Sequence, residues 1–243
     1  MLRNLLRIAA PAIVALALAA PPSANAEGQD FSGALVKVQW AEAPSWSQVA
    51  AVYPDRARRE RMGGHAQLMC GLDGDLRPTA CKVLSEKPGR YGFGAAALQL
   101  ARDFTAPHTD ANGAYLELAG AFVFIDVAFT PAMLEASAPP LANARLVRAP
   151  ESLDLRQSFP QKALAAHVTA GQVMLACTVG DQGWLTDCSV SSEDPAGLGF
   201  GKAALDLSPH FQVSVWGDDG LPTIGGRVSV PIRYQPGAPA ATN

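Results

Sequence analysis

The sequence has little charge of either sign and few aromatic residues. Charged residues make up 17% of its 243 positions, aromatic residues make up 7%, and the formal net charge is −3. A protein that binds nucleic acid non-specifically, or an anionic membrane surface, usually carries basic patches. This composition argues against both partners, and 49% apolar residues are typical of a globular protein.

The sequence also lacks the short motifs that mark common active sites. It contains no G-x-S-x-G, no H-E-x-x-H and no C-x-x-C. The run Gly92-Phe93-Gly94 has neither Walker nor dinucleotide-binding spacing. We therefore expect no catalytic residues, no cofactor and no metal site, so that the protein is not an enzyme. A periplasmic enzyme or small-ligand-binding protein stays as a lesser alternative.

A cysteine-framed segment of about forty residues occurs twice. Residues 64–104 match residues 171–211 at a constant offset, and the matched positions include both cysteines and a Gly-Phe-Gly run. Self-similarity at a fixed period determines the architecture before any local pattern does. A period near a hundred residues predicts two small domains rather than a solenoid. No histidine recurs between the copies, so His65, His108, His167 and His210 are interpreted as surface or capping residues.

Four cysteines form two pairs, each spaced eleven residues apart. An even number of cysteines in an exported chain indicates disulfides. A pairing retained in each copy must be local, which predicts the bonds Cys70–Cys81 and Cys177–Cys188. Zinc is the rival interpretation, but the short spacing of zinc-binding cysteine pairs is missing.

The first 26 residues resemble a secretory signal. Two arginines precede the apolar run Ile8 to Ala20, and Ala24-Asn25-Ala26 then supplies small residues for a signal peptidase. This run is too short to span a bilayer comfortably, and no second one follows. Cleavage would change the net charge from −3 to −5, because Arg3 and Arg7 are lost. We expect a periplasmic protein, with an uncleaved membrane anchor as the alternative.

Each copy predicts the same order of elements: a short helix, a two-stranded hairpin, an amphipathic helix and a closing strand. Apolar residues alternate in the hairpin, which is typical of half-buried strands and places both cysteines of a pair on the inward face. Pro209 is expected to shorten the second amphipathic helix relative to the first.

The two closing strands differ. Residues 121–129 are continuously apolar, whereas residues 228–234 contain Pro231, which cannot donate a ladder hydrogen bond. A long apolar edge left bare invites aggregation. We therefore expect 121–129 to be the stronger pairing edge, covered either by the other copy or by a partner peptide.

This order of elements resembles the C-terminal domain of TonB-family energy transducers. The residues that carry the resemblance in the first copy are Tyr53, Pro54, Ala57, Gly64, Asp73, Gly74, Phe93, Ala96, Ala97 and Leu98. Their counterparts in the second copy are Phe159, Pro160, Ala163, Gly171, Asp181, Gly183, Phe200, Ala203, Ala204 and Leu205. The resemblance implies an α+β fold, with helices packed on a small antiparallel sheet in each of two tandem domains.

The expected organisation follows from the repeat and the resemblance. Its segments are a signal peptide (1–26), a flexible segment (27–36), a first domain (37–130), a linker (131–143), a second domain (144–236) and a flexible tail (237–243).

The resemblance also implies a function: binding the periplasmic part of an outer-membrane transport protein. The chain lacks the long Pro-, Lys- and Glu-rich segment of a true transducer, so we expect an interaction module that contacts envelope components without coupling energy. An inner-membrane-anchored transducer is the alternative. Its partner would be an envelope protein or peptide that adds a strand to the sheet. The candidate contact residues are Tyr53, Pro54, Val123, Ile125, Val127, Phe159 and Pro160.

Overall fold

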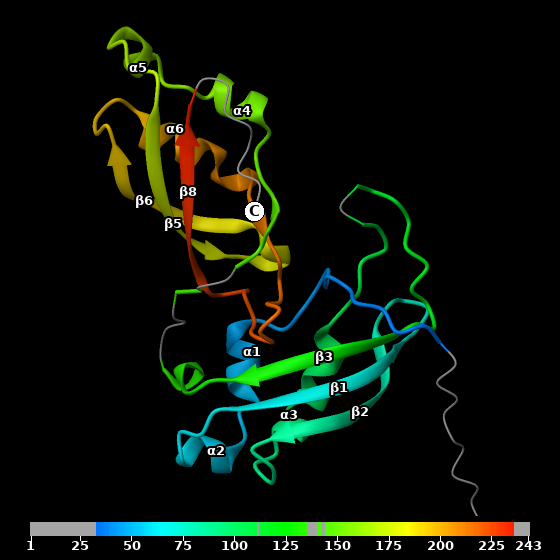
Figure 1. Ribbon diagram of the computed structural model, residues 1–243. Helices are drawn as coiled ribbons and strands as arrows, with labels where there is room; N and C mark the ends of the chain where they lie inside the picture. The colour runs from blue at the N-terminus through cyan, green and yellow to red at the C-terminus, as the bar shows by residue number, and fades with distance from the viewer. Residues whose placement is uncertain (1–32, 111, 136–139, 142–143, 236–243) are drawn as a thin grey trace, which may run out of the picture. The chain divides into compact units, whose positions relative to one another are not determined.

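The computed structural model describes residues 33–110, 112–135, 140–141 and 144–235 (Figure 1). The expected signal peptide, the tail, and parts of the expected N-terminal segment and linker lie outside these residues. The fold is mixed α+β with small antiparallel sheets, as expected. Within the described residues, no helix is both long enough and apolar enough to cross a membrane.

The first copy builds one three-stranded sheet and its covering helices. Its elements are α1 (Trp46–Ala51), α2 (Asp55–Arg59), β1 (Gly64–Leu72), β2 (Pro78–Lys87), α3 (Phe93–Leu100), the 3-10 helix η1 (Ala101–Asp103), β3 (Phe122–Phe129) and the 3-10 helix η2 (Pro131–Leu134). The strand order is β2-β1-β3, so β1 is central and β3 lies at an edge (Figure 1).

The second copy repeats this order. Its elements are β4 (Leu146–Arg148), α4 (Ser152–Gln157), α5 (Gln161–Ala165), β5 (Gly171–Val179), η3 (Asp181–Gly183), β6 (Leu185–Asp194), α6 (Phe200–Leu207), η4 (Ser208–His210), β7 (Gln212–Val213) and β8 (Arg227–Tyr234). The main sheet has the order β6-β5-β8, and β4 pairs with β7 in a separate two-stranded sheet.

The registers of the two main sheets are equivalent. Val123 lies opposite Cys70, and Val228 lies opposite Cys177. The two closing strands therefore align residue by residue, and Asp126 occupies the place that Pro231 has in the second copy.

Both disulfides join the pairs expected from the sequence, Cys70–Cys81 and Cys177–Cys188. The first cysteine of each pair is buried, but its partner is only half-buried. The hairpin register shifts beside the disulfide, and Ala80 has a positive φ of 49°. Because this bulge interrupts the alternation of the return strand, the inward orientation expected for both cysteines holds fully only for the first.

The two amphipathic helices have the same length, so the expected shortening by Pro209 is wrong. Each helix has eight residues and continues into a 3-10 turn. Pro209 lies inside the second of these turns, at a position where its missing N–H is tolerated.

An aromatic ring from the amphipathic helix crosses a glycine of the central strand in each copy. A Cβ atom added to Gly64 would lie 2.1 Å from the ring of Phe93, and one added to Gly171 would lie 2.7 Å from the ring of Phe200. Phe93 also packs against Phe129 of the closing strand, with 5.2 Å between ring centroids. The glycine lets the helix approach the sheet closely enough to bury that ring fully.

A third aromatic residue completes this cluster in each copy. Tyr53 packs edge-on against Phe129 at 5.7 Å, and its hydroxyl donates to the carbonyl oxygen of Met62 at 2.8 Å. In the second copy the equivalent pair is Phe159 and Tyr234, so the hydroxyl has moved to the closing strand. Burial raises the pKa of Tyr234 to about 12.

The carboxylate of Glu86 caps the N-terminal end of α3. It accepts hydrogen bonds from the backbone N–H groups of Tyr91 at 3.0 Å, Gly92 at 2.8 Å and Gly94 at 3.2 Å. Burial by itself raises the pKa of Glu86, but these N–H donors outweigh it, and the pKa is lowered. Glu193 repeats the cap on α6 through the N–H of Gly199.

The crossing of Gly64 by Phe93 makes Gly64→Ala a test of the core. The added methyl group overlaps a buried ring, so we expect a loss of roughly 1–3 kcal/mol in the free energy of unfolding, measured by urea titration. Gly74→Ala is the matched control, because a Cβ there meets nothing within 4 Å. Equal stability of the two variants would contradict the proposed role of the crossing.

Glu86 predicts a pH dependence of stability. Its pKa is lower in the folded chain than in the unfolded one, so it stabilises the fold above the unfolded pKa of about 4.5. That contribution is lost as the pH falls through the lowered folded pKa. We expect Glu86→Gln to cost about 1–2 kcal/mol at pH 7 and less at pH 3. Glu117→Gln, which changes an exposed carboxylate, is the control in pH-resolved urea titrations.

Candidate binding site at the edge of strand β3

A hairpin of the second copy packs against the core of the first. Trp216 and Pro222 pair across it, and the N–H of Gly217 donates to the carbonyl oxygen of Leu221 at 2.9 Å. The ring of Trp216 lies edge-on to Phe104, with 4.8 Å between centroids. We call residues 216–222 the docking hairpin.

The outer edge of β3 is covered at both ends. At its beginning, the N–H of Phe122 donates to the carbonyl oxygen of Ala34 at 2.9 Å, and the N–H of Val36 donates to the carbonyl oxygen of Phe122 at 2.8 Å. Toward its end, the indole N–H of Trp216 donates to the carbonyl oxygen of Asp126 at 3.0 Å. The N–H of Ala128 then donates to the carbonyl oxygen of Gly220 at 2.8 Å.

Phe124 lies between these two covers. In an antiparallel ladder the backbone groups of alternate residues face away from the neighbouring strand. Those of Phe122, Asp126 and Ala128 face outward, so those of Phe124 do too. Within the described part of the chain, neither group of Phe124 has a hydrogen-bond partner. At Phe124 the edge of β3 therefore offers one donor and one acceptor to another chain.

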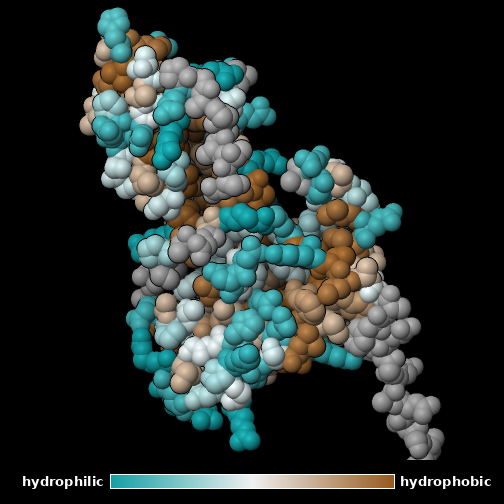
Figure 2. Space-filling model, viewed as in Figure 1, coloured by the Kyte–Doolittle hydropathy of each residue, from teal (hydrophilic) through white to brown (hydrophobic). Residues whose placement is uncertain are grey.

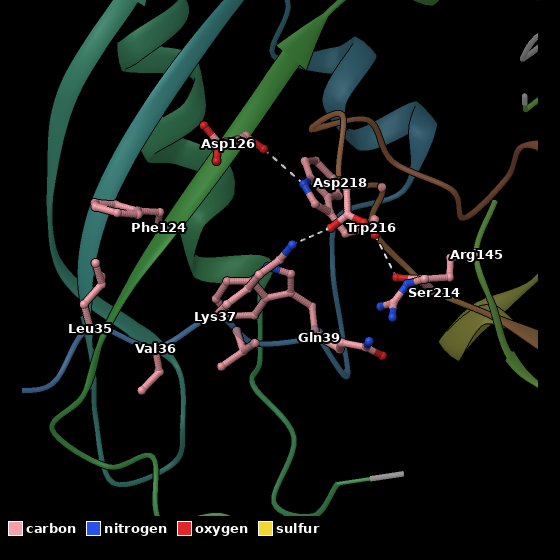
Figure 3. Close-up of a pocket in the computed structure, with 13 residues that line it drawn as sticks. Leu35, Val36, Lys37, Gln39, Phe124, Asp126, Arg145, Ser214, Trp216 and Asp218 are labelled. Carbon is pink, nitrogen blue, oxygen red and sulfur yellow. Dashed lines mark hydrogen bonds and ion pairs between the residues drawn. The ribbon is translucent and has the colours of Figure 1, made fainter. Parts of the chain in front are cut away.

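An open groove of about 680 Å³ lies along this gap (Figure 3). Residues 35–40 form one wall, β3 forms another, and residues 214–218 close the end. Leu35 is 56% exposed and Phe124 is 40% exposed, so apolar surface is accessible in the groove. The groove combines a backbone edge with apolar side chains, which is the combination that strand addition uses.

Charged side chains surround the mouth of the groove. Lys37 and Asp218 form an ion pair across it at 3.1 Å, which is drawn as a dashed line in Figure 3. Arg145 and Asp126 also line it. The carboxylate of Asp126 is positioned from β1, because His65 Nε2 lies 3.3 Å away from its Oδ1 and the side-chain amide of Gln67 donates to it at 3.0 Å.

The equivalent edge of the second copy is polar. The outward-facing residues of β3 are Phe122, Phe124, Asp126 and Ala128, and their counterparts on β8 are Arg227, Ser229, Pro231 and Arg233. Figure 2 shows apolar residues gathered on the visible surface near the beginning of β3. Because the two copies share one register, this difference isolates β3 as the apolar edge.

Most of the contact residues expected from the sequence are in the core instead. Tyr53, Val123, Ile125 and Val127 are all buried, so their side chains cannot contact a partner. Alternate residues of a strand face opposite sides of the sheet, and the expectation selected the inward set. Pro54, Phe159 and Pro160 are half-buried beside the aromatic clusters, away from the groove.

Phe124, residues 34–36 and Trp216 are not among the contact residues expected from the sequence. The sequence could have indicated Phe124, since it lies in the apolar closing strand between two residues whose side chains face the core. Residues 34–36 fall in the segment expected to be flexible, yet they pair with β3. No local sequence pattern predicts the contact of Trp216, because its hydrogen-bond partner Asp126 lies 90 positions away in the sequence.

The described residues hold no group of histidine, cysteine, aspartate and glutamate side chains that could bind a metal ion. Among the described residues that line the groove there is no histidine and no cysteine.

Comparison with known proteins gives a match over part of the chain. The chain is 35% identical over 98 residues to an uncharacterized protein of Caulobacter vibrioides. The match covers 39% of this chain and 92% of the relative, and the chain belongs to the same family as that protein. No family model matches the chain. A match of 98 residues is close to the length of one copy.

Proposed function

We propose that this protein is an interaction module of the cell envelope, made of two TonB C-terminal-like domains, that binds an extended segment of an envelope protein. The repeated order of helix, hairpin, helix and strand supports the TonB-like assignment. The module binds without coupling energy. Its proposed partner is a component of outer-membrane transport or another envelope protein.

The proposal rests on the part of the β3 edge at Phe124 where the backbone N–H and C=O groups have no partner among the described residues, which we call the window. Within the part of the chain that the structure describes, a donor and an acceptor are unpaired there beside apolar surface, while Phe122 on one side and the carbonyl oxygen of Asp126 on the other have partners. Edge strands in soluble proteins are usually covered or charged. An uncovered apolar window at one edge, absent from the equivalent edge in the second copy, is what a strand-adding ligand would use.

Both disulfides fit an extracytoplasmic location. We propose the periplasm as the compartment and residues 1–26 as a cleaved signal. N-terminal sequencing of the exported protein should then begin at Glu27. Recovery of the intact chain in the inner-membrane fraction would support the anchored-transducer alternative.

Site-specific photocrosslinking tests the window directly. The photoreactive residue p-benzoylphenylalanine would replace Phe124 in one strain and Ser229 in another, because these positions are equivalent on β3 and β8. We expect ultraviolet light to join the first variant to a specific envelope protein, with at least about a tenfold weaker product from the second. Mass spectrometry of the product identifies the crosslinked segment.

Two outcomes would contradict this proposal. Equal crosslinking from both positions would mean that contact at β3 is not specific. A product confined to a second copy of this chain would mean that the groove is an interface between identical subunits.

A further inference from the structure

Residues 33–37 already behave as a short strand on the edge of β3. We call them the strap. Leu35 bridges Phe122 in the parallel orientation, and two backbone hydrogen bonds hold Ala34 and Val36 to Phe122. Gly33 allows the approach, since a Cβ there would lie 2.3 Å from the carbonyl oxygen of Gly120.

The strap covers only the first part of the edge. It pairs with Phe122 and then leaves β3, so the next outward-facing residue, Phe124, has no partner among the described residues. A chain that continued straight along the edge would pair with both residues.

The strap is weakly held. Beyond the two backbone hydrogen bonds, its ion pair joins Lys37 to Asp218, and these side chains are 87% and 70% exposed. Exposed ion pairs contribute between about 0 and 1 kcal/mol. Its side chains alternate, with Val36 half-buried and both Leu35 and Lys37 exposed. Val36 packs against the core of the first copy, so a competing strand can replace the strap when it places an apolar side chain at that position.

The charges of the groove indicate what that strand carries. Asp218, Asp126, Arg145 and Lys37 line it, and Lys37 leaves with the strap. Two carboxylates and one guanidinium then remain, so a basic side chain is favoured at the position of Lys37.

We propose that the strap is a displaceable occupant of the binding site, and that the partner segment takes its place. That segment runs parallel to β3, with an apolar residue where Val36 lies and a lysine or arginine facing Asp218. This inference rests on the proposed function, and it adds the orientation, the chemistry and the internal competitor of the ligand.

A labelled synthetic peptide with the sequence of residues 33–40 tests the displacement. In the intact protein the strap competes at an effective concentration on the order of millimolar. Val36→Pro removes the N–H that bonds Phe122, so this variant should bind the peptide at least about tenfold more tightly than the wild type in fluorescence anisotropy.

The second copy supplies a matched control. The N–H of Leu141 donates to the carbonyl oxygen of Arg227 at the equivalent place on β8, and Leu141→Pro removes that bond. This variant should bind the peptide no better than the wild type. Gly33→Ala is a second way to loosen the strap, and it should behave like Val36→Pro. If neither loosened variant binds more tightly than the wild type, the proposal is wrong.

Charge exchange tests the chemistry. In the Val36→Pro background, Asp218→Lys should weaken binding of the peptide by about 2- to 5-fold. A peptide carrying Lys37→Glu should recover that loss. If neither change alters the affinity for the peptide, the proposal of a basic residue facing Asp218 is wrong.

These results are separable from the proposed function. Specific crosslinking at Phe124 together with a strap that cannot be displaced would overturn this inference alone. Peptide binding without specific crosslinking in cells would leave the strap displaceable and overturn the envelope partner.

Discussion

The crossing of a strand glycine by a helical phenylalanine is the constraint on which both copies depend. Gly64 has no side chain, so the ring of Phe93 lies directly on the central strand and reaches Phe129 and Tyr53. This single contact joins the central strand, the amphipathic helix, the closing strand and the segment that precedes the hairpin. Aromatic rings in edge-on contact also contribute beyond the area they bury. The other elements are positioned relative to this cluster, which the second copy repeats around Phe200.

With the core fixed in this way, the surface edges are free to diverge. The inward-facing residues of β3 and β8 are apolar in both copies, because they cover equivalent clusters. The outward-facing residues have no such constraint, and they are apolar around Phe124 but polar around Ser229. The hydroxyl that moves from Tyr53 to Tyr234 shows that even the cluster tolerates exchange when its volume is kept. The surface positions at which the two copies differ are therefore the best indication of where their functions differ.

The backbone of an edge strand creates a second constraint, since its outward-facing groups need partners or solvent. Here residues far apart in the chain supply them. The strap bonds to Phe122, and the docking hairpin bonds to Asp126 and Ala128 through Trp216 and Gly220. The candidate site is the part of the β3 edge between the strap and the docking hairpin, so residues from both copies form it. Binding at the groove would thus be sensitive to the packing of Trp216 as well as to β3 itself.

The sequence by itself determined the repeated order of elements, the disulfide pairs and the equivalence of the closing strands, because these depend on local periodicity and on comparison of one copy with the other. It also indicated that 121–129 was the more apolar edge. Only the tertiary structure decided which residues of that strand face outward, what covers them, and that Phe124 stays uncovered. The physical reason is the separation of the residues along the sequence, because alternation and spacing are properties of residues that are close together in the chain. The contacts of Trp216 with Asp126, and of Val36 with Phe122, exist only once distant segments have packed around the aromatic core.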